Sequence, residues 1–197
     1  GAVLLAPKIN YMDNGNIASI DKVSRNEEIR EYCKANNINF YRVKHNDTLK
    51  IKTIVENNDI DVGLIGGAKI IHQSIIEMFK LGIINYHPGR IPETSGLDSL
   101  YRTIEKLVPP CVTAHLIDEN CDTGAIVKQE RIEISYNDTG ASLLEKYSRV
   151  YLKMLTYLLN EVESDNLTAE LQDESKATYF HKRTPDDGEI NWGWQKE

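Results

Sequence analysis

The sequence predicts an α/β domain with a mostly parallel sheet and helices on both faces of that sheet. Short apolar stretches alternate with amphipathic stretches along residues 2–81, which is the rhythm of parallel strands and crossover helices. Two apolar stretches at residues 112–118 and 125–134 predict an antiparallel hairpin. The apolar spacing over residues 138–163 predicts the longest helix, packed against the sheet.

The bulk composition is that of one globular domain. The chain has 197 residues, 41% hydrophobic and 27% charged, which is enough for a sizeable core, and its formal net charge is -7. An acidic chain is a poor match for nucleic acid, so we expect no nucleic-acid partner. Three widely spaced cysteines argue against a disulfide framework and favour a cytoplasmic location. No apolar run approaches the ~18 residues of a membrane span, so we expect no membrane partner.

The first half of the chain alternates strands and helices. Residues 2–6 predict a buried strand ended by Pro7, and the polar residues 8–22 predict a loop. A capping box at residues 24–27 predicts a helix to about residue 35. The elements expected next are a strand at 38–43, a helix at 48–57, a strand at 61–65 and a helix at 72–81. In the helix at 48–57 we expect an inner side made of Leu49, Ile51, Ile54 and Val55.

The next strand carries two polar residues at its end. The apolar run 81–84 should continue to His87, because Pro88 favours an extended residue before it and removes a backbone donor. Asn85 and His87 then point to one face, since strand side chains alternate. Active sites of open α/β sheets lie at such an edge, although an Asn-x-His pair could also merely satisfy backbone groups. After a loop, an amphipathic helix is expected from Leu97, Leu100, Ile104 and Leu107.

The order of motifs around this strand resembles the folate-dependent formyltransferases, which include the glycinamide ribonucleotide, methionyl-tRNA and nucleotide-sugar enzymes. The matching residues are Asn85-x-His87-Pro88-Gly89-x-Ile91-Pro92, then Gly96, then Asp122-Thr123-Gly124. A weaker likeness at residues 177–183 and 189–192 is to the segment that closes the catalytic domain in methionyl-tRNA and sugar formyltransferases, and the chain as a whole most resembles the sugar N-formyltransferases. The resemblance implies a Rossmann-like formyltransferase fold, with residues 1–165 as catalytic domain and 166–197 as a tail closing it. Members usually begin with an earlier strand and a Gly-rich loop, and we expect this first unit to be missing here.

The resemblance implies a catalytic trio of Asn85, His87 and Asp122. During formyl transfer an amine attacks the formyl carbon and an oxyanion forms. The Asn85 amide can donate to that oxyanion, and His87 can donate to it or accept the amine proton. Asp122 can orient the imidazole and favour its protonated form. We expect no metal. The alternative of a metal site made of His115, Asp118 and Asp122 is disfavoured, because strand alternation puts His115 and Asp118 on opposite faces.

The resemblance also implies sites for the formyl donor, 10-formyltetrahydrofolate, and for an acceptor. Backbone groups can recognise a pterin edge, although Gly66-Gly67 could equally be an ordinary turn between strand and helix. The residues expected at the donor are Gly67, Lys69, Ile71, Ile117, Asp118 and Glu119. On the acceptor side we expect Gly96 and Arg90, which could hold a phosphate or carboxylate, or could be a solvated loop residue.

We therefore expect an enzyme, a folate-dependent N-formyltransferase. The favoured acceptor is a primary amine on a nucleotide-linked amino sugar, a small molecule, because the acidic charge and the absence of a second domain disfavour tRNA. Alternatives are a glycinamide ribonucleotide formyltransferase, a methionyl-tRNA formyltransferase-like protein, a formyltetrahydrofolate hydrolase, and a non-catalytic folate-binding protein. A homodimer is also left open.

Overall fold

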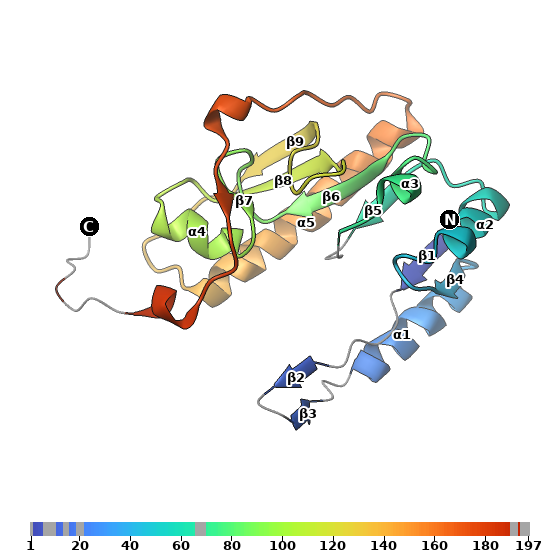
Figure 1. The fold of residues 1–197 in the computed structure, drawn as a ribbon, viewed down its shortest axis with the longest axis horizontal. Coiled ribbons are helices and arrows are strands. Elements are labelled where there is room, and N and C mark those ends of the chain that lie inside the picture. The colour runs from blue at the N-terminus through green and yellow to red at the C-terminus, as the bar shows by residue number, and fades with distance from the viewer. Residues whose placement is uncertain are drawn as a thin grey trace. The chain divides into compact units, whose positions relative to one another are not determined.

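The computed structural model describes the backbone of residues 2–5, 11–13, 16–18, 22–65, 70–189 and 193, and within these ranges the side chains from residue 28 onward. The chain divides into two compact units (Figure 1). Unit 1 comprises residues 1–63 and 68–83, and unit 2 comprises residues 64–67 and 84–197. None of the described helices has the length and apolar character that crossing a membrane requires.

Unit 1 contains a parallel strand pair with its crossover helix. β1 (Ala2–Leu5) pairs in parallel with β4 (Asn39–Arg42), and α1 (Lys22–Ala35) lies between them in sequence. β2 (Tyr11–Asp13) and β3 (Asn16–Ala18) form an antiparallel hairpin, so the prediction of a plain loop at residues 8–22 was wrong. The signal for this hairpin is the Asn-Gly dipeptide at positions 14 and 15, a pair that favours two-residue hairpin turns.

The other two helices of unit 1 differ from expectation in detail. In α2 (Thr48–Asn57), Ile51, Ile54 and Val55 are buried as predicted, but Leu49 is 81% exposed. Residues two positions apart in an α-helix are roughly 200° apart around its axis, so Leu49 and Ile51 cannot share a face. α3 (Gln73–Ile76) is shorter than the predicted helix at 72–81, because the chain continues in tight turns such as Phe79 N–H to Ile76 O.

The sheet of unit 2 has the strand order β5, β6, β8, β9. These strands are β5 (Gly63–Ile65), β6 (Ile83–His87), β8 (Cys111–Leu116) and β9 (Ile126–Arg131). β8 is antiparallel to both β6 and β9, which confirms the predicted hairpin. Strand pairing in the chain as a whole is partly parallel, and the predicted α/β class is confirmed.

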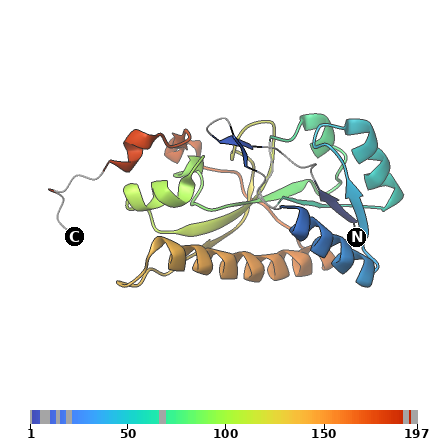
Figure 2. The same cartoon turned by 90° about the horizontal axis from the view of Figure 1, so that it is seen from below.

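α5 (Gly140–Glu163) is the 24-residue helix that the apolar spacing predicted, and it runs along one face of the sheet (Figure 2). Thr139 caps its start by a capping box with Ser142. The buried side chains Leu143, Tyr147, Met154 and Leu158 form its inner stripe. Burying one such side chain stabilises the fold by about 1.5–3 kcal/mol, so this stripe is a main part of the core.

α4 (Ser99–Glu105) buries a different face from the one that the apolar spacing predicted. Its buried residues are the polar Ser99 and Thr103, each 1% exposed, while Leu97, Ile104 and Leu107 are exposed. The Ser99 hydroxyl donates to the Gly96 carbonyl at 3.0 Å, so this polar side chain is buried with a hydrogen-bond partner.

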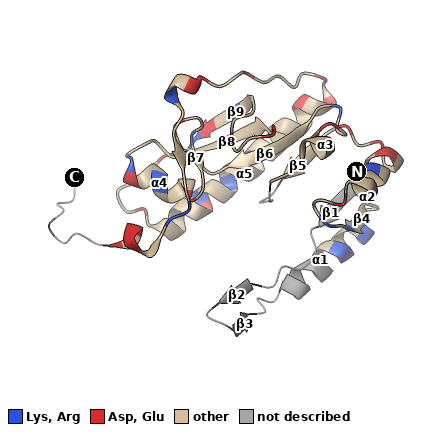
Figure 3. Cartoon of the chain, viewed as in Figure 1, with Lys and Arg blue, Asp and Glu red and all other residues tan. Residues whose placement is uncertain are grey.

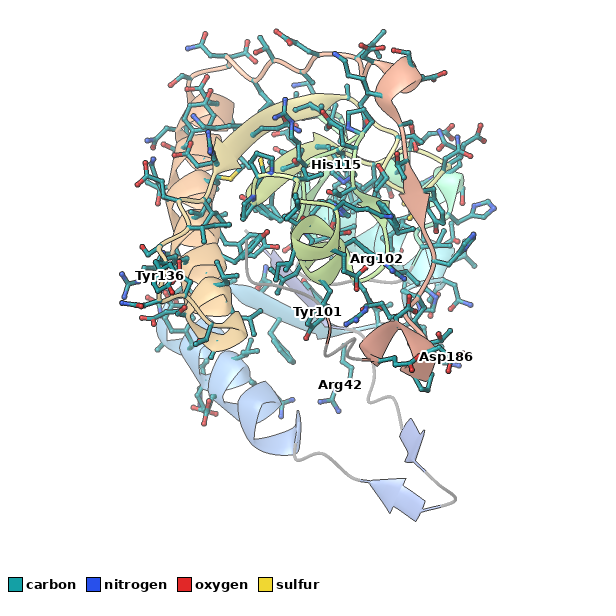
Figure 4. All side chains as sticks on the ribbon, turned by 90° about the vertical axis from the view of Figure 1, so that its left-hand side faces the viewer. Arg42, Tyr101, Arg102, His115, Tyr136 and Asp186 are labelled. Atoms are coloured by element: carbon teal, nitrogen blue, oxygen red, sulfur yellow. The ribbon has the colours of Figure 1, made fainter. Side chains whose placement is uncertain are left out.

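The described part of the tail, residues 166–189, packs on unit 2. Its short strand β10 (Tyr179–Phe180) pairs in parallel with β7 (Ser95–Gly96). η1 (Glu174–Lys176) precedes β10, and η2 (Pro185–Gly188) follows it. Figure 3 shows negative charge on η2, and Figure 4 shows Arg102 of α4 beside the turn that carries Asp186. The Arg102 guanidinium lies 3.2 Å from the Asp187 carboxylate, which ties the tail to α4.

Candidate active site

β6 presents Asn85 and His87 on the face of the sheet that α5 does not cover. On the other face, Ile84 is fully buried and the Tyr86 ring meets Tyr151 of α5 edge-on, with the ring centroids 5.6 Å apart. Burial raises the pKa of Tyr86 to about 12, as expected for a phenol in the core. The period-two geometry of the strand therefore separates a core face from a polar face.

Both ring nitrogens of His87 have protein partners, and the side chain is buried. Nε2 lies 2.8 Å from the backbone carbonyl of Thr94, and Nδ1 lies 3.3 Å from Oδ2 of Asp122. A carbonyl oxygen only accepts, so Nε2 carries a hydrogen and donates it. The carboxylate also only accepts, so both contacts are satisfied together when the ring is an imidazolium.

The His-Pro-Gly turn folds back against this ring. A Cβ atom on Gly89 would lie 2.9 Å from Nε2 of His87 and 2.4 Å from Oγ1 of Thr94. The Thr113 hydroxyl donates to the Gly89 carbonyl at 2.7 Å and holds the turn in place. Gly89 is therefore needed because the backbone approaches the imidazole too closely for a side chain.

Asp122 contacts three residues of the candidate site, His87, Gly96 and His115, which together with Asn85 and Asp122 are called the cluster below. Its Oδ2 accepts from the Gly96 N–H at 2.8 Å, and its Oδ1 lies 3.6 Å from Nε2 of His115. Burial by itself raises the pKa of the Asp122 carboxyl, but contacts with His115, His87 and the Gly96 N–H outweigh it and hold the pKa well below its usual range. Asp122 is therefore an ionised carboxylate that lies within reach of both imidazole rings.

His115 is a member of the cluster that the sequence argument missed, because it was weighed only as a metal ligand. It is almost fully buried on β8, directly across from Asn85 in the antiparallel register. Its Nδ1 donates to the Leu116 carbonyl at 2.8 Å, and its Nε2 lies 3.2 Å from Nδ2 of Asn85. The signal that could have found it is the pairing of β6 with β8, since residues opposite each other share a face.

The residues expected at the formyl donor fall into two groups. Gly67 and Lys69 lie outside the described residues, and Ile71 is a partly exposed residue of unit 1. In unit 2, the Asp118 carboxylate accepts from the Asn120 N–H at 3.0 Å and from the Thr123 hydroxyl at 2.7 Å, which shapes the loop after β8.

The backbone of that loop offers free hydrogen-bonding groups. Within the part of the chain that the structure describes, the N–H and C=O groups of residues 117–119 make no hydrogen bond to another residue. The loop therefore leads from β8 to Asp122 with backbone donors and acceptors available for a ligand.

The two residues expected at the acceptor lie in different surroundings. The Arg90 guanidinium is 3.3 Å from the Glu93 carboxylate, and its side chain is 48% exposed. Gly96 is buried with a φ of 98°, and a Cβ there would lie 2.2 Å from the Phe180 carbonyl. Gly96 thus links Asp122 to the tail, and the acceptor roles of both residues stay predictions.

Comparison with known proteins identifies a protein family that matches this sequence. Residues 11–158 match the profile of the family described as "Formyl transferase". A methionyl-tRNA formyltransferase of Kosmotoga olearia is 33% identical over 120 residues, which is 60% of this chain and 39% of that protein. The enzyme of the same name from Caldicellulosiruptor saccharolyticus is 29% identical over 83% of this chain and 53% of its own length. The chain thus spans about half or less of these relatives.

A solved structure is similar in fold. It is the formyltransferase PseJ from Anoxybacillus kamchatkensis, with a TM-score of 0.64 and 22% identity, covering 92% of this chain and 86% of that one. It was solved in complex with UDP-4,6-dideoxy-4-formamido-L-AltNAc and tetrahydrofolate. The family match covers well over half of the sequence and includes Asn85, His87 and Asp122, so this chain belongs to the formyltransferase family.

Proposed function

We propose that this chain transfers a formyl group from 10-formyltetrahydrofolate to a primary amine. The observation that carries the proposal is the cluster in which the His87 imidazole lies 3.3 Å from the Asp122 carboxylate, with Asn85 on the same face of β6. Acyl transfer to an amine needs a hydrogen-bond donor for the oxyanion and a group that moves a proton, and the Asn85 amide and the His87 imidazole paired with Asp122 can supply them. Membership of the formyltransferase family supports the same chemistry.

In the proposed reaction, the amine nitrogen attacks the formyl carbon, and the bond from that carbon to the folate nitrogen breaks. The amide nitrogen of Asn85 carries two hydrogens, and only one is directed at His115, so the other can donate to the developing oxyanion. The amine loses a proton, and the folate nitrogen gains one. We assign this proton transfer to Nδ1 of His87, the ring nitrogen on the Asp122 side, which takes the proton in the neutral form of the ring and then gives it to the folate nitrogen, while Nε2 keeps its hydrogen bond to Thr94.

The formyl donor is proposed to bind the loop that leads to Asp122. The backbone groups of residues 117–119, which bond to no other described residue, can recognise the donor and acceptor pattern of a pterin without particular side chains. Gly67, Lys69 and Ile71 remain proposed donor contacts on the strength of the family resemblance alone. PseJ, which is similar in fold, was solved with tetrahydrofolate, and this supports a folate as the formyl donor.

A nucleotide-linked amino sugar is the acceptor we favour. The net charge of -7 disfavours a tRNA, whose phosphates would be repelled. The likeness in fold to PseJ, solved with a UDP-linked formamido sugar, supports a sugar acceptor. The main rival is methionyl-tRNA, because the curated relatives carry that name.

A panel assay tests the proposal. The purified chain is incubated with 10-formyltetrahydrofolate and, in turn, UDP- and dTDP-linked amino sugars, glycinamide ribonucleotide, methionyl-tRNA or no amine. Folate turnover is followed by absorbance, and the formylated product by mass spectrometry. We expect turnover that depends on a nucleotide amino sugar. Turnover without any amine would indicate a hydrolase, and no turnover with any acceptor would contradict formyl transfer.

A further inference from the structure

The tail contacts the Asp122 loop through a residue that the proposed reaction does not use. The side-chain amide of Gln172, fifty positions after Asp122, donates to the backbone carbonyl of Asp122 at 2.8 Å and to that of Gly124 at 2.7 Å. One amide therefore holds the carbonyl groups of the two residues on either side of Thr123. This is the place where the chain turns from the proposed folate loop into β9.

The turn at this point needs such support. Asp122 has a φ of 59°, in the left-handed region that residues with a Cβ atom seldom adopt. The next glycine is equally constrained, since a Cβ on Gly124 would lie 1.9 Å from the Leu116 carbonyl. The hydrogen bonds from Gln172 hold the turn in this unfavourable backbone geometry.

The same tail acts on the carboxylate of Asp122 from another direction. The backbone of Phe180 lies against Gly96, and the Leu97 N–H donates to the Phe180 carbonyl at 2.8 Å. Gly96 in turn donates its N–H to Oδ2 of Asp122. The tail thus contacts the Asp122 region in two ways. Gln172 bonds to the backbone of Asp122, and β10 packs against Gly96, whose N–H bonds to the Asp122 carboxylate.

We propose that Gln172 is a positioning residue, which fixes the Asp122 turn so that the carboxylate meets the Gly96 N–H and the His87 ring. This proposal rests on the proposed function, because Gln172 would act through Asp122, and Asp122 is catalytic only if the chain transfers a formyl group. The titratable groups that face Asp122 are His87, His115 and the Cys121 thiol, whose Sγ lies 3.7 Å from Oδ2. Among the described residues, the side-chain hydrogen bonds to these backbone carbonyls come from Gln172.

The test is the variant Gln172→Met, which keeps the length of the side chain and removes both donors. Amide hydrogen exchange, followed by NMR, reports the bond from Gly96 to Asp122 directly. We expect the Gly96 amide to exchange about tenfold faster, the size expected from losing hydrogen bonds of ordinary net strength. The Leu97 amide, bonded to the tail and not to Asp122, should be unchanged, and kcat for formyl transfer should fall about tenfold.

Gln129→Met is the matched control. Gln129 also donates to two acceptors, the Ile91 carbonyl at 2.7 Å and the Thr113 hydroxyl at 3.1 Å, but it does not touch the Asp122 turn. It should leave exchange at Gly96 unchanged. If Gln172→Met does not fold, Gln172→Asn replaces it, because the shorter amide falls short of both carbonyls and predicts the same result.

Two outcomes would overturn the proposal. Unchanged exchange at Gly96 would show that Gln172 does not position Asp122, and equal acceleration at Gly96 and Leu97 would show that the variant merely releases the tail. Because exchange needs no turnover, it is read even if the wild-type chain transfers no formyl group. A wild-type chain without formyl-transfer activity would contradict the proposed function, whereas the exchange experiment would still test whether Gln172 positions the Asp122 turn.

Discussion

His87 and Asp122 face each other across 3.3 Å, yet they are held by different kinds of structure. His87 is positioned locally, by its strand and by a carbonyl seven residues later in the chain. Asp122 is positioned by distant residues, with Gly96 lying 26 positions before it and Gln172 fifty positions after it. One half of the site depends on local sequence and the other half on how the tail packs. The two halves should therefore respond differently to mutation.

The largest effect is expected at the locally held half. His87→Asn should lower turnover about 10²–10⁴-fold, because it removes the group that passes the proton. Folate affinity should change little, since the pterin is proposed to bind backbone groups of residues 117–119. Isothermal calorimetry beside steady-state kinetics separates the two quantities. A loss of folate binding that parallels the loss of turnover would mean that His87 has a structural role.

The distantly held half should be broken by a change at Gly96. Gly96→Ala places a Cβ 2.2 Å from the Phe180 carbonyl and imposes a φ of 98° on a residue with a side chain. We expect the free energy of unfolding to fall by about 2–3 kcal/mol in urea titrations. Gly140→Ala is the control, because a Cβ there meets nothing within 4 Å and helix propensity favours alanine. Equal stability of the two variants would show that the junction with β10 is not needed.

The smallest effect is expected outside both halves, at Arg90. Arg90→Ala should raise the apparent KM for the amine acceptor about tenfold and that for folate much less, as expected from losing a charge-assisted contact with a phosphate. Arg149→Ala is the control, since Arg149 is also exposed and also pairs with a carboxylate on its own segment. If the two variants have the same acceptor kinetics, Arg90 is a solvated loop residue.

The sequence predicted the features that depend on local periodicity. The long helix α5, the hairpin of β8 and β9, and the placement of Asn85 and His87 on one face all follow from the spacing of apolar residues and from strand alternation. Sequence also led to Asp122, through a motif order that resembles a known family.

Features that depend on tertiary contacts were missed. The apolar spacing around α4 predicted an inward face that includes Leu107, but Leu107 is 84% exposed and the buried side chains of the helix are Ser99 and Thr103. His115 was missed because strand alternation gives the face of a residue but not its cross-strand neighbour, which depends on register. The hydrogen bonds from Gln172 to the Asp122 turn could not be predicted either, since Gln172 and Asp122 are fifty positions apart in the sequence.

The central claim is that His87 and Asp122 act as one unit, and a double-mutant cycle tests it most directly. The rate of formyl transfer is measured for His87→Asn, Asp122→Asn and the double variant, with the same donor and acceptor. If the carboxylate works through the imidazole that it contacts at 3.3 Å, the double variant should lose about as much activity as the more damaging single variant. If instead the two losses multiply, the residues act independently and this account of the site is contradicted.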